Sequence, residues 1–153
     1  QIVENIPPLG YILGDEGSGA VLGKHFLNGI FKGWLEPDLK TEYLKWSGFS
    51  YSEIIEKVYR QPMANRYLAS IVPFISQHML RYPLLENMVV KSFREFLRLN
   101  VAPYNRADLP VNFVGGVANA FAVQLFKAID YEGLTFGKIV HRPVIGLMKF
   151  HIG

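Results

Sequence analysis

The chain has 153 residues, of which half are hydrophobic and 14% aromatic, a composition that suits one folded domain and argues against disorder. Its net charge of +3 comes from scattered lysines and arginines, so we expect neither nucleic acid nor a membrane as a partner. The sequence contains no cysteine, which excludes disulfides and thiolate metal sites and fits a cytoplasmic location.

The N-terminal part predicts one short extended segment and one helix. Residues 9–13 are apolar and flanked by glycine, which favours a strand or an extended entry. Residues 14–19 form a polar, glycine-rich turn. Ser18 is a good N-cap for a helix that ends near Gly33, because apolar residues recur four apart between them.

The middle of the chain predicts three more helices. One covers residues 50–60 and is capped by Ser52. The next covers residues 63–80, where Pro73 should kink or divide it. A third begins at Pro83, because proline suits the first position of a helix.

The C-terminal part mixes strands with helices. We expect strands at 111–114 and 137–141, a tight turn at 115–116, a helix over 118–129 and a last short helix from Pro143. A strand, a turn and a helix in this order are typical of an α/β fold. The expected fold class is therefore α/β and helix-rich, with a small sheet packed by helices, and so small a sheet suggests that other strands lie outside the chain.

The turn over residues 14–19 (GDEGSG) could bind a ligand. Its glycines allow a close approach of the backbone, and the helix start behind it offers free N–H groups. A carboxylate here could accept hydrogen bonds from sugar hydroxyls. The alternative is that Asp15 and Glu16 only stabilise the helix start, and at most one of these two adjacent side chains should face a pocket.

The glycine pair Gly115–Gly116 is the second candidate, because ligands of such sheets bind beyond the carboxyl ends of strands. An ordinary strand-to-helix turn remains the alternative, since neither G-x-G-x-x-G nor G-x-x-x-x-G-K-[ST] occurs in the sequence. The four histidines show no zinc-binding spacing, so we expect no metal ligands in this chain.

The two segments together resemble the family of N-acetylglucosamine kinases and BadF/BadG/BcrA/BcrD ATPases. Residues 9–19 (LGYILGDEGSG) are similar to the family segment G-W-G-x-x-x-G-D-E-G-S, and residues 113–118 (FVGGVA) resemble its adenosine motif. The ending, residues 143–151, resembles the family's closing segment. Two positions depart from the pattern: the tryptophan of G-W-G is missing before Gly10, and Tyr82 with Pro83 stands where many relatives have Gly-Asp.

The resemblance implies the actin-like, RNase H-like fold, in which two lobes hold ATP between them. Residues 1–153 would form an incomplete C-terminal lobe of a sugar kinase or ATPase. The N-terminal lobe, with the phosphate loops D-x-G-x-T-K-T and G-T-G-S and the catalytic base, would lie upstream of Gln1, and the missing initiator methionine fits this expectation. We therefore expect no catalytic residue in this chain, and no turnover by the chain alone.

Binding residues carry over from the family position by position. The sugar-binding set is Gly14, Asp15 and Glu16, in which Asp15 would bind the sugar hydroxyls. The nucleotide-binding set is Ala69, Gly115, Gly116 and Asn119.

The implied activity is transfer of the ATP γ-phosphate to a hydroxyl of an N-acetylhexosamine, N-acetylglucosamine first among them. ATP and Mg²⁺ are the implied cofactors, and the sugar, the missing lobe and a second copy of the chain are the implied partners. One rival is a BadF-type ATPase that activates a dehydratase through an interfacial iron–sulfur cluster, against which the lack of cysteine counts. Another rival is a non-catalytic domain that binds a nucleotide or a sugar.

Overall fold

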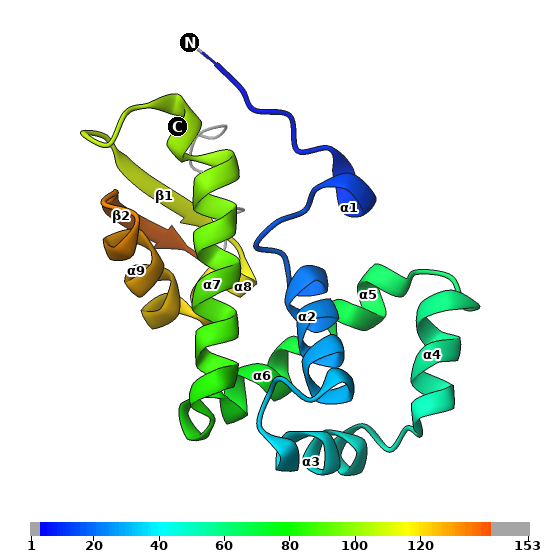
Figure 1. The fold of residues 1–153 in the computed structure, drawn as a ribbon. Coiled ribbons are helices and arrows are strands. Elements are labelled where there is room, and N and C mark those ends of the chain that lie inside the picture. The colour runs from blue at the N-terminus through cyan, green and yellow to red at the C-terminus, as the bar shows by residue number, and fades with distance from the viewer. Residues whose placement is uncertain (1–3, 142–153) are drawn as a thin grey trace, which may run out of the picture.

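A long central helix, α7 (Pro83–Asn100), separates two groups of elements in the computed structural model, which describes residues 4–141 (Figure 1). On one side lie the helices α2 to α6, and on the other lie the two strands with α9, while α8 follows β1 close beside α7 (Figure 1). Helix α7 packs against α2 on the first side and against α9 on the second. The buried side chains of all these elements form one hydrophobic core. The expected α/β, helix-rich class is confirmed.

The segment predicted as extended is instead a single helical turn, α1 (Gly10–Leu13). Leu9 and Gly10 both have positive φ, 59° and 75°, and the N–H of Gly14 donates to the carbonyl of Gly10 at 2.9 Å. None of the residues of α1 is buried. The apolar residues predicted a strand, but among the described residues no neighbouring strand pairs with this segment. The flanking glycines allow the backbone to form a helical turn instead.

Helix α2 (Gly19–Lys32) agrees with the prediction. The Ser18 hydroxyl caps it by accepting a hydrogen bond from the N–H of Val21 at 3.2 Å. Gly33 ends the helix in the left-handed conformation, with φ 79°. The sequence reading overlooked the next helix, α3 (Pro37–Ser47), because much of its surface is polar and it buries only Leu39 and Tyr43.

Helix α4 (Tyr51–Tyr59) is capped by Ser50 and not, as predicted, by Ser52. Ser50 Oγ accepts from the N–H of Glu53, while the Glu53 carboxylate accepts from the N–H of Ser50 at 2.7 Å. This reciprocal pair satisfies two free donors at once, and it places the helix start two residues earlier than a cap at Ser52 would.

The stretch predicted as one helix over 63–80 is divided, as the proline indicated. It forms α5 (Ala64–Ala69), α6 (Val72–His78) and the 3₁₀ turn η1 (Met79–Arg81). Pro73 lies in the first turn of α6, where its missing N–H costs no helical hydrogen bond.

Helix α7 begins at Pro83 as predicted, and a 3₁₀ turn, η2 (Ala102–Tyr104), follows it. The Tyr104 hydroxyl accepts a hydrogen bond from the N–H of Ile6 at 2.9 Å, which holds the N-terminal segment beside η2. No helix among residues 4–141 has both the length and the apolar character that a membrane span requires.

The strands β1 (Pro110–Val114) and β2 (Thr135–Val140) pair in parallel, with α8 (Gly116–Ala120) and α9 (Ala122–Tyr131) between them along the chain. They form a β-α-β unit, whose two strands make up the sheet in the described part of the chain. The single helix predicted over 118–129 is broken at Phe121, whose side chain is fully buried and whose φ of −120° and ψ of 35° are not helical. The helix predicted from Pro143 lies outside the described residues.

Candidate functional site

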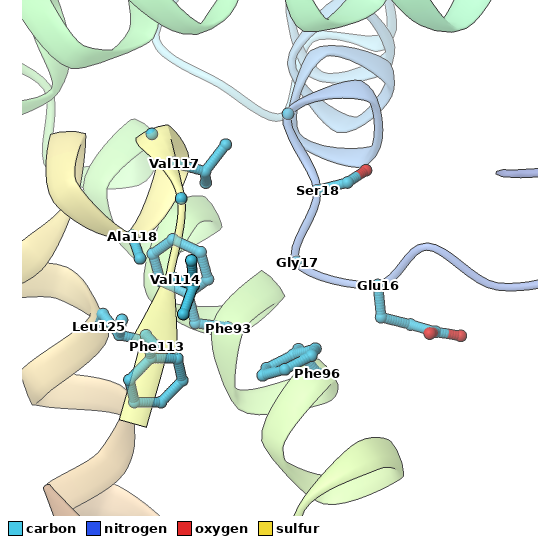
Figure 2. A pocket seen from close by; sticks show the side chains of 13 residues that line it. Glu16, Gly17, Ser18, Phe93, Phe96, Phe113, Val114, Val117, Ala118 and Leu125 are labelled. Atoms are coloured by element: carbon cyan, nitrogen blue, oxygen red, sulfur yellow. The ribbon is translucent and has the colours of Figure 1, made fainter. Parts of the chain in front are cut away.

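A cavity of about 340 Å³ lies where the two sequence motifs meet (Figure 2). One side is the loop that leads into α2, and the other is the turn between β1 and α8. These two segments are about a hundred residues apart in the chain. The cavity is lined by Glu16, Gly17, Ser18, Gly19, Phe93, Phe96, Phe113, Val114, Gly115, Gly116, Val117, Ala118 and Leu125. The fold thus brings both motifs to one place.

The walls of this cavity are largely apolar. Helix α7 contributes the rings of Phe93 and Phe96, the strand β1 contributes Phe113, and α9 contributes Leu125 (Figure 2). Aromatic and aliphatic walls with a few polar groups are typical of sites for small organic ligands. Flat rings are also favourable partners for other aromatic rings, which suits a purine base.

The turn at Gly115 has a backbone that glycine alone adopts readily. Its φ of 125° and ψ of 171° lie in a region that is unfavourable for side chains. The N–H of Gly115 donates to the carbonyl of Val140 at 3.1 Å, so the turn is fixed to the end of β2. A Cβ atom at Gly115 or at Gly116 would meet no other atom within 4 Å. The backbone is therefore held firmly and its outer side is open to a ligand.

The loop that carries the two carboxylates has a tightly turned backbone. Asp15 adopts φ 71°, which is uncommon for a residue with a side chain but tolerated by aspartate, and Gly17 adopts φ 75°. The carbonyl of Asp15 accepts a hydrogen bond from the N–H of Ser18 at 3.0 Å. Glu16 borders the cavity, and its Oε2 atom accepts a hydrogen bond from the Asn100 side chain at 3.3 Å.

The predicted site residues therefore fall into two groups. Three of them, Glu16, Gly115 and Gly116, line the cavity together. The other four, Gly14, Asp15, Ala69 and Asn119, are not among its lining residues.

Each of these four lies close to the cavity motifs in the chain or in space. Gly14 and Asp15 directly precede Glu16, and Asn119 is exposed on α8, where its N–H donates to the carbonyl of Gly115 at 3.3 Å. Ala69 lies behind the loop on α5, since a Cβ atom at Gly19 would stand 3.4 Å from its Cβ.

Two residues of α7 belong to the site although the sequence reading gave them no role in it. Phe96 lines the cavity and Asn100 binds Glu16. With Phe93 they are spaced three and four residues apart, so they lie on one face of the helix. This spacing was visible in the sequence, but nothing in it showed that the face meets the loop at Glu16.

The cavity wall formed by α7 is tied to α9 by an ion-pair cluster. The Glu132 carboxylate, which directly follows α9, accepts from Arg94 Nε at 2.6 Å and from Arg98 Nε at 2.9 Å. The hydrogen bond from Arg94, assisted by Arg98, lowers the pKa of the Glu132 carboxyl from its ordinary value of 4.5. The Arg94 guanidinium also lies over the Tyr131 ring, 4.0 Å from its centroid.

In the part of the chain that the structure describes, no three side chains of His, Asp or Glu lie close enough together to hold a metal ion. The contribution of this chain to the cavity consists mainly of apolar walls and glycine backbone, and the Glu16 carboxylate points away from the apolar walls (Figure 2).

Comparison with known proteins adds a close structural neighbour. The sequence matches no family model and no curated protein. A crystal structure of a Porphyromonas gingivalis protein, provisionally named an N-acetylglucosamine kinase, superimposes with a TM-score of 0.93 at 46% sequence identity. The match covers 99% of this chain and 53% of the neighbour, so the chain spans about half of the neighbour's length. The resemblance to N-acetylglucosamine kinases that the sequence predicts is confirmed by this structural match.

Proposed function

We propose that this chain is the C-terminal lobe of an ATP-dependent sugar kinase that phosphorylates N-acetylglucosamine or a related N-acetylhexosamine. One observation carries the proposal: the sugar-type loop and the adenosine-type turn, far apart in the sequence, line the same cavity. The name of the structural neighbour points to the same activity.

The cavity suits the base of a nucleotide. Its volume of about 340 Å³ lies within the roughly 300–1,000 Å³ that is usual for small-molecule sites. The rings of Phe93, Phe96 and Phe113 provide apolar surface for the purine, and the open side of Gly115 lets the backbone approach the adenosine.

The sugar would bind at the loop around Asp15, next to the cavity. The Asp15 carboxylate would accept hydrogen bonds from two sugar hydroxyls. Such hydrogen bonds to a charged group are stronger than hydrogen bonds between neutral groups. The β- and γ-phosphates, the Mg²⁺ ion and the catalytic base are left to the other lobe. The described residues offer no cluster of carboxylates for the metal. Mg²⁺, when bound with ATP, would neutralise the charge that develops during phosphoryl transfer.

The role of this lobe in catalysis is then positioning. Holding the sugar hydroxyl in line with the γ-phosphate converts an encounter of two molecules into a step within one complex. Walls that exclude water around the base and the sugar also strengthen the hydrogen bonds that hold them. The part of the site in this chain would fix the two substrates, while the other lobe would act on the phosphates.

The test is a coupled assay of ADP release by the full-length protein, with MgATP and a panel of sugars that includes N-acetylglucosamine, N-acetylmannosamine, glucosamine and glucose. Turnover that depends on an N-acetylhexosamine supports the proposal. Turnover without sugar would indicate a BadF-type ATPase instead. Binding of ATP or of sugar without any turnover would indicate a binding domain. Residues 1–153 alone should show none of the roughly 1–100 s⁻¹ turnover that is usual for kinases.

A further inference from the structure

The side-chain amide of Asn100, the last residue of α7, connects the helix to the loop. Its Nδ2 atom lies 3.3 Å from Oε2 of Glu16 and 3.2 Å from the carbonyl oxygen of Phe96. An amide nitrogen carries two hydrogens, so both of its donors are used. The bond to Glu16 joins residues 84 positions apart in the chain.

A second contact between the same two segments lies one residue further along the loop. A Cβ atom at Gly17 would stand 3.1 Å from both Cβ and Cγ of Phe96. The backbone of the loop therefore rests directly on this aromatic side chain, and Figure 2 shows the Phe96 ring facing the loop near Gly17. Phe96 also lines the cavity with Gly115 and Gly116. One helix face thus contacts the loop and borders the space next to the glycine turn.

We propose that Asn100 is a positioning residue, which together with Phe96 clamps the loop over residues 14–19 to the last turn of α7. The clamp fixes the distance between the Asp15 region and the turn at Gly115. A ligand-binding loop without such anchors opens readily, because few buried contacts oppose its motion. The part of this inference that concerns sugar binding rests on the proposed function, whereas the clamp itself does not.

A simpler role for Asn100 would be to end the helix. Its bond to the Phe96 carbonyl, four residues back in the same helix, is a local side-chain bond of the kind that asparagine makes near helix ends. That role needs no partner on the loop, and the bond to Glu16 would then be incidental. The two roles differ in what they predict for a change at position 16.

The experiment begins with Asn100→Asp in the full-length protein. The substitution keeps the shape of the side chain, removes both donors and places a carboxylate next to Glu16. Asn87→Asp makes the same chemical change at an exposed position of the same helix and is the matched control. The readouts are hydrogen–deuterium exchange in a peptide that covers residues 9–21, without substrates, and the KM values for sugar and ATP.

We expect hydrogen–deuterium exchange in the loop to become about tenfold faster in Asn100→Asp, because one hydrogen bond to a charged group is lost. In Asn87→Asp the exchange should stay at the wild-type rate. The sugar KM should rise by a similar factor, while the ATP KM should change by less than about threefold. If the aspartate variant does not fold, Asn100→Ala removes the donors without adding charge and is measured in the same way.

The rescue is the double variant Asn100→Asp with Glu16→Gln, in which donor and acceptor exchange sides. The new glutamine amide can donate to the new carboxylate, although the bond to the Phe96 carbonyl stays lost. Exchange in the loop should return most of the way to the wild-type rate. The proposal is overturned if loop exchange in the double variant is as fast as in Asn100→Asp. It is also overturned if loop exchange in Asn100→Asp stays at the wild-type rate. Restored exchange in a protein without sugar-dependent turnover would instead refute the proposed function and leave the clamp standing.

Discussion

The backbone of Gly17 lies against the side chain of Phe96, so closely that a Cβ atom at position 17 would stand 3.1 Å from both Cβ and Cγ of the phenylalanine. This contact joins a loop near the N-terminus to the last turns of α7. There are thus two reasons for glycine at this position: the close contact leaves no room for a side chain, and φ is 75°.

The first prediction separates these two reasons for Gly17. Gly17→Ala should lower the free energy of unfolding by about 2–5 kcal/mol, because backbone strain of about 1–2 kcal/mol adds to overpacking of about 1–3 kcal/mol. Gly48→Ala is the control: φ is 71° there, but nothing lies within 4 Å of the added Cβ. Gly48→Ala should lower the free energy of unfolding only by the backbone strain of about 1–2 kcal/mol. Both variants are measured by urea unfolding of the full-length protein. Equal losses would show that the Phe96 side chain moves aside without cost.

The second prediction concerns the sugar. Asp15→Asn should raise the sugar KM and lower kcat/KM by about ten- to a hundredfold, because a hydrogen bond to a charged group is worth about 1.5–3 kcal/mol. Asparagine also tolerates the positive φ of 71°, so the loop should keep its shape. The ATP KM should hardly change. Asp130→Asn, exposed near the end of α9, serves as the control. An equal loss for both substrates would mean that Asp15 supports the structure.

The third prediction concerns the nucleotide. Gly116 is exposed, its φ is not in the left-handed region, and a Cβ there would meet nothing within 4 Å. Gly116→Val should therefore leave folding close to normal, yet weaken ATP binding at least about tenfold if the adenosine approaches this backbone. Ala120→Val places the same side chain at the exposed end of the same helix, outside the cavity lining. Titration calorimetry that gives the same ATP affinity for Gly116→Val and wild type would exclude this turn from the nucleotide site.

The fourth prediction concerns the acid stability of the link between α7 and α9. The hydrogen bond from Arg94, together with Arg98, lowers the pKa of Glu132 in the folded state. A lowered pKa stabilises the fold at pH values above the ordinary 4.5, and this contribution is lost as the pH falls through the lower folded-state value. Glu132→Gln should therefore be less stable than wild type at pH 7, and the difference should shrink below about pH 4.

The measurement for Glu132 is urea unfolding at several pH values between 7 and 3. Glu56→Gln, on α4 and exposed, controls for the loss of a carboxylate away from the two arginines. A stability difference between wild type and Glu132→Gln that stays constant over this range would show that the charge of Glu132 contributes nothing to folding.

Local sequence signals were enough for many of the elements. Ser18 and Gly33 bound α2, Pro83 begins α7 and Pro73 divides a helical stretch, because each acts on the backbone within one turn. The same local logic failed for residues 9–13. There the apolar residues suggested a strand, but the segment forms a helical turn. A strand needs a neighbouring strand to pair with, and this pairing depends on the tertiary structure.

The motifs themselves, and with them the resemblance to N-acetylglucosamine kinases, were visible in the sequence as short patterns in a fixed order. What only the tertiary structure decided is which side chains complete the site. Glu16 and Gly115 border the same cavity because α7 packs against both α2 and α9, and Phe96 and Asn100 join the site because their helix face meets the loop. A helical period predicts that such residues share a face, but what that face contacts depends on the packing of segments far apart in the chain, on which local sequence carries no information.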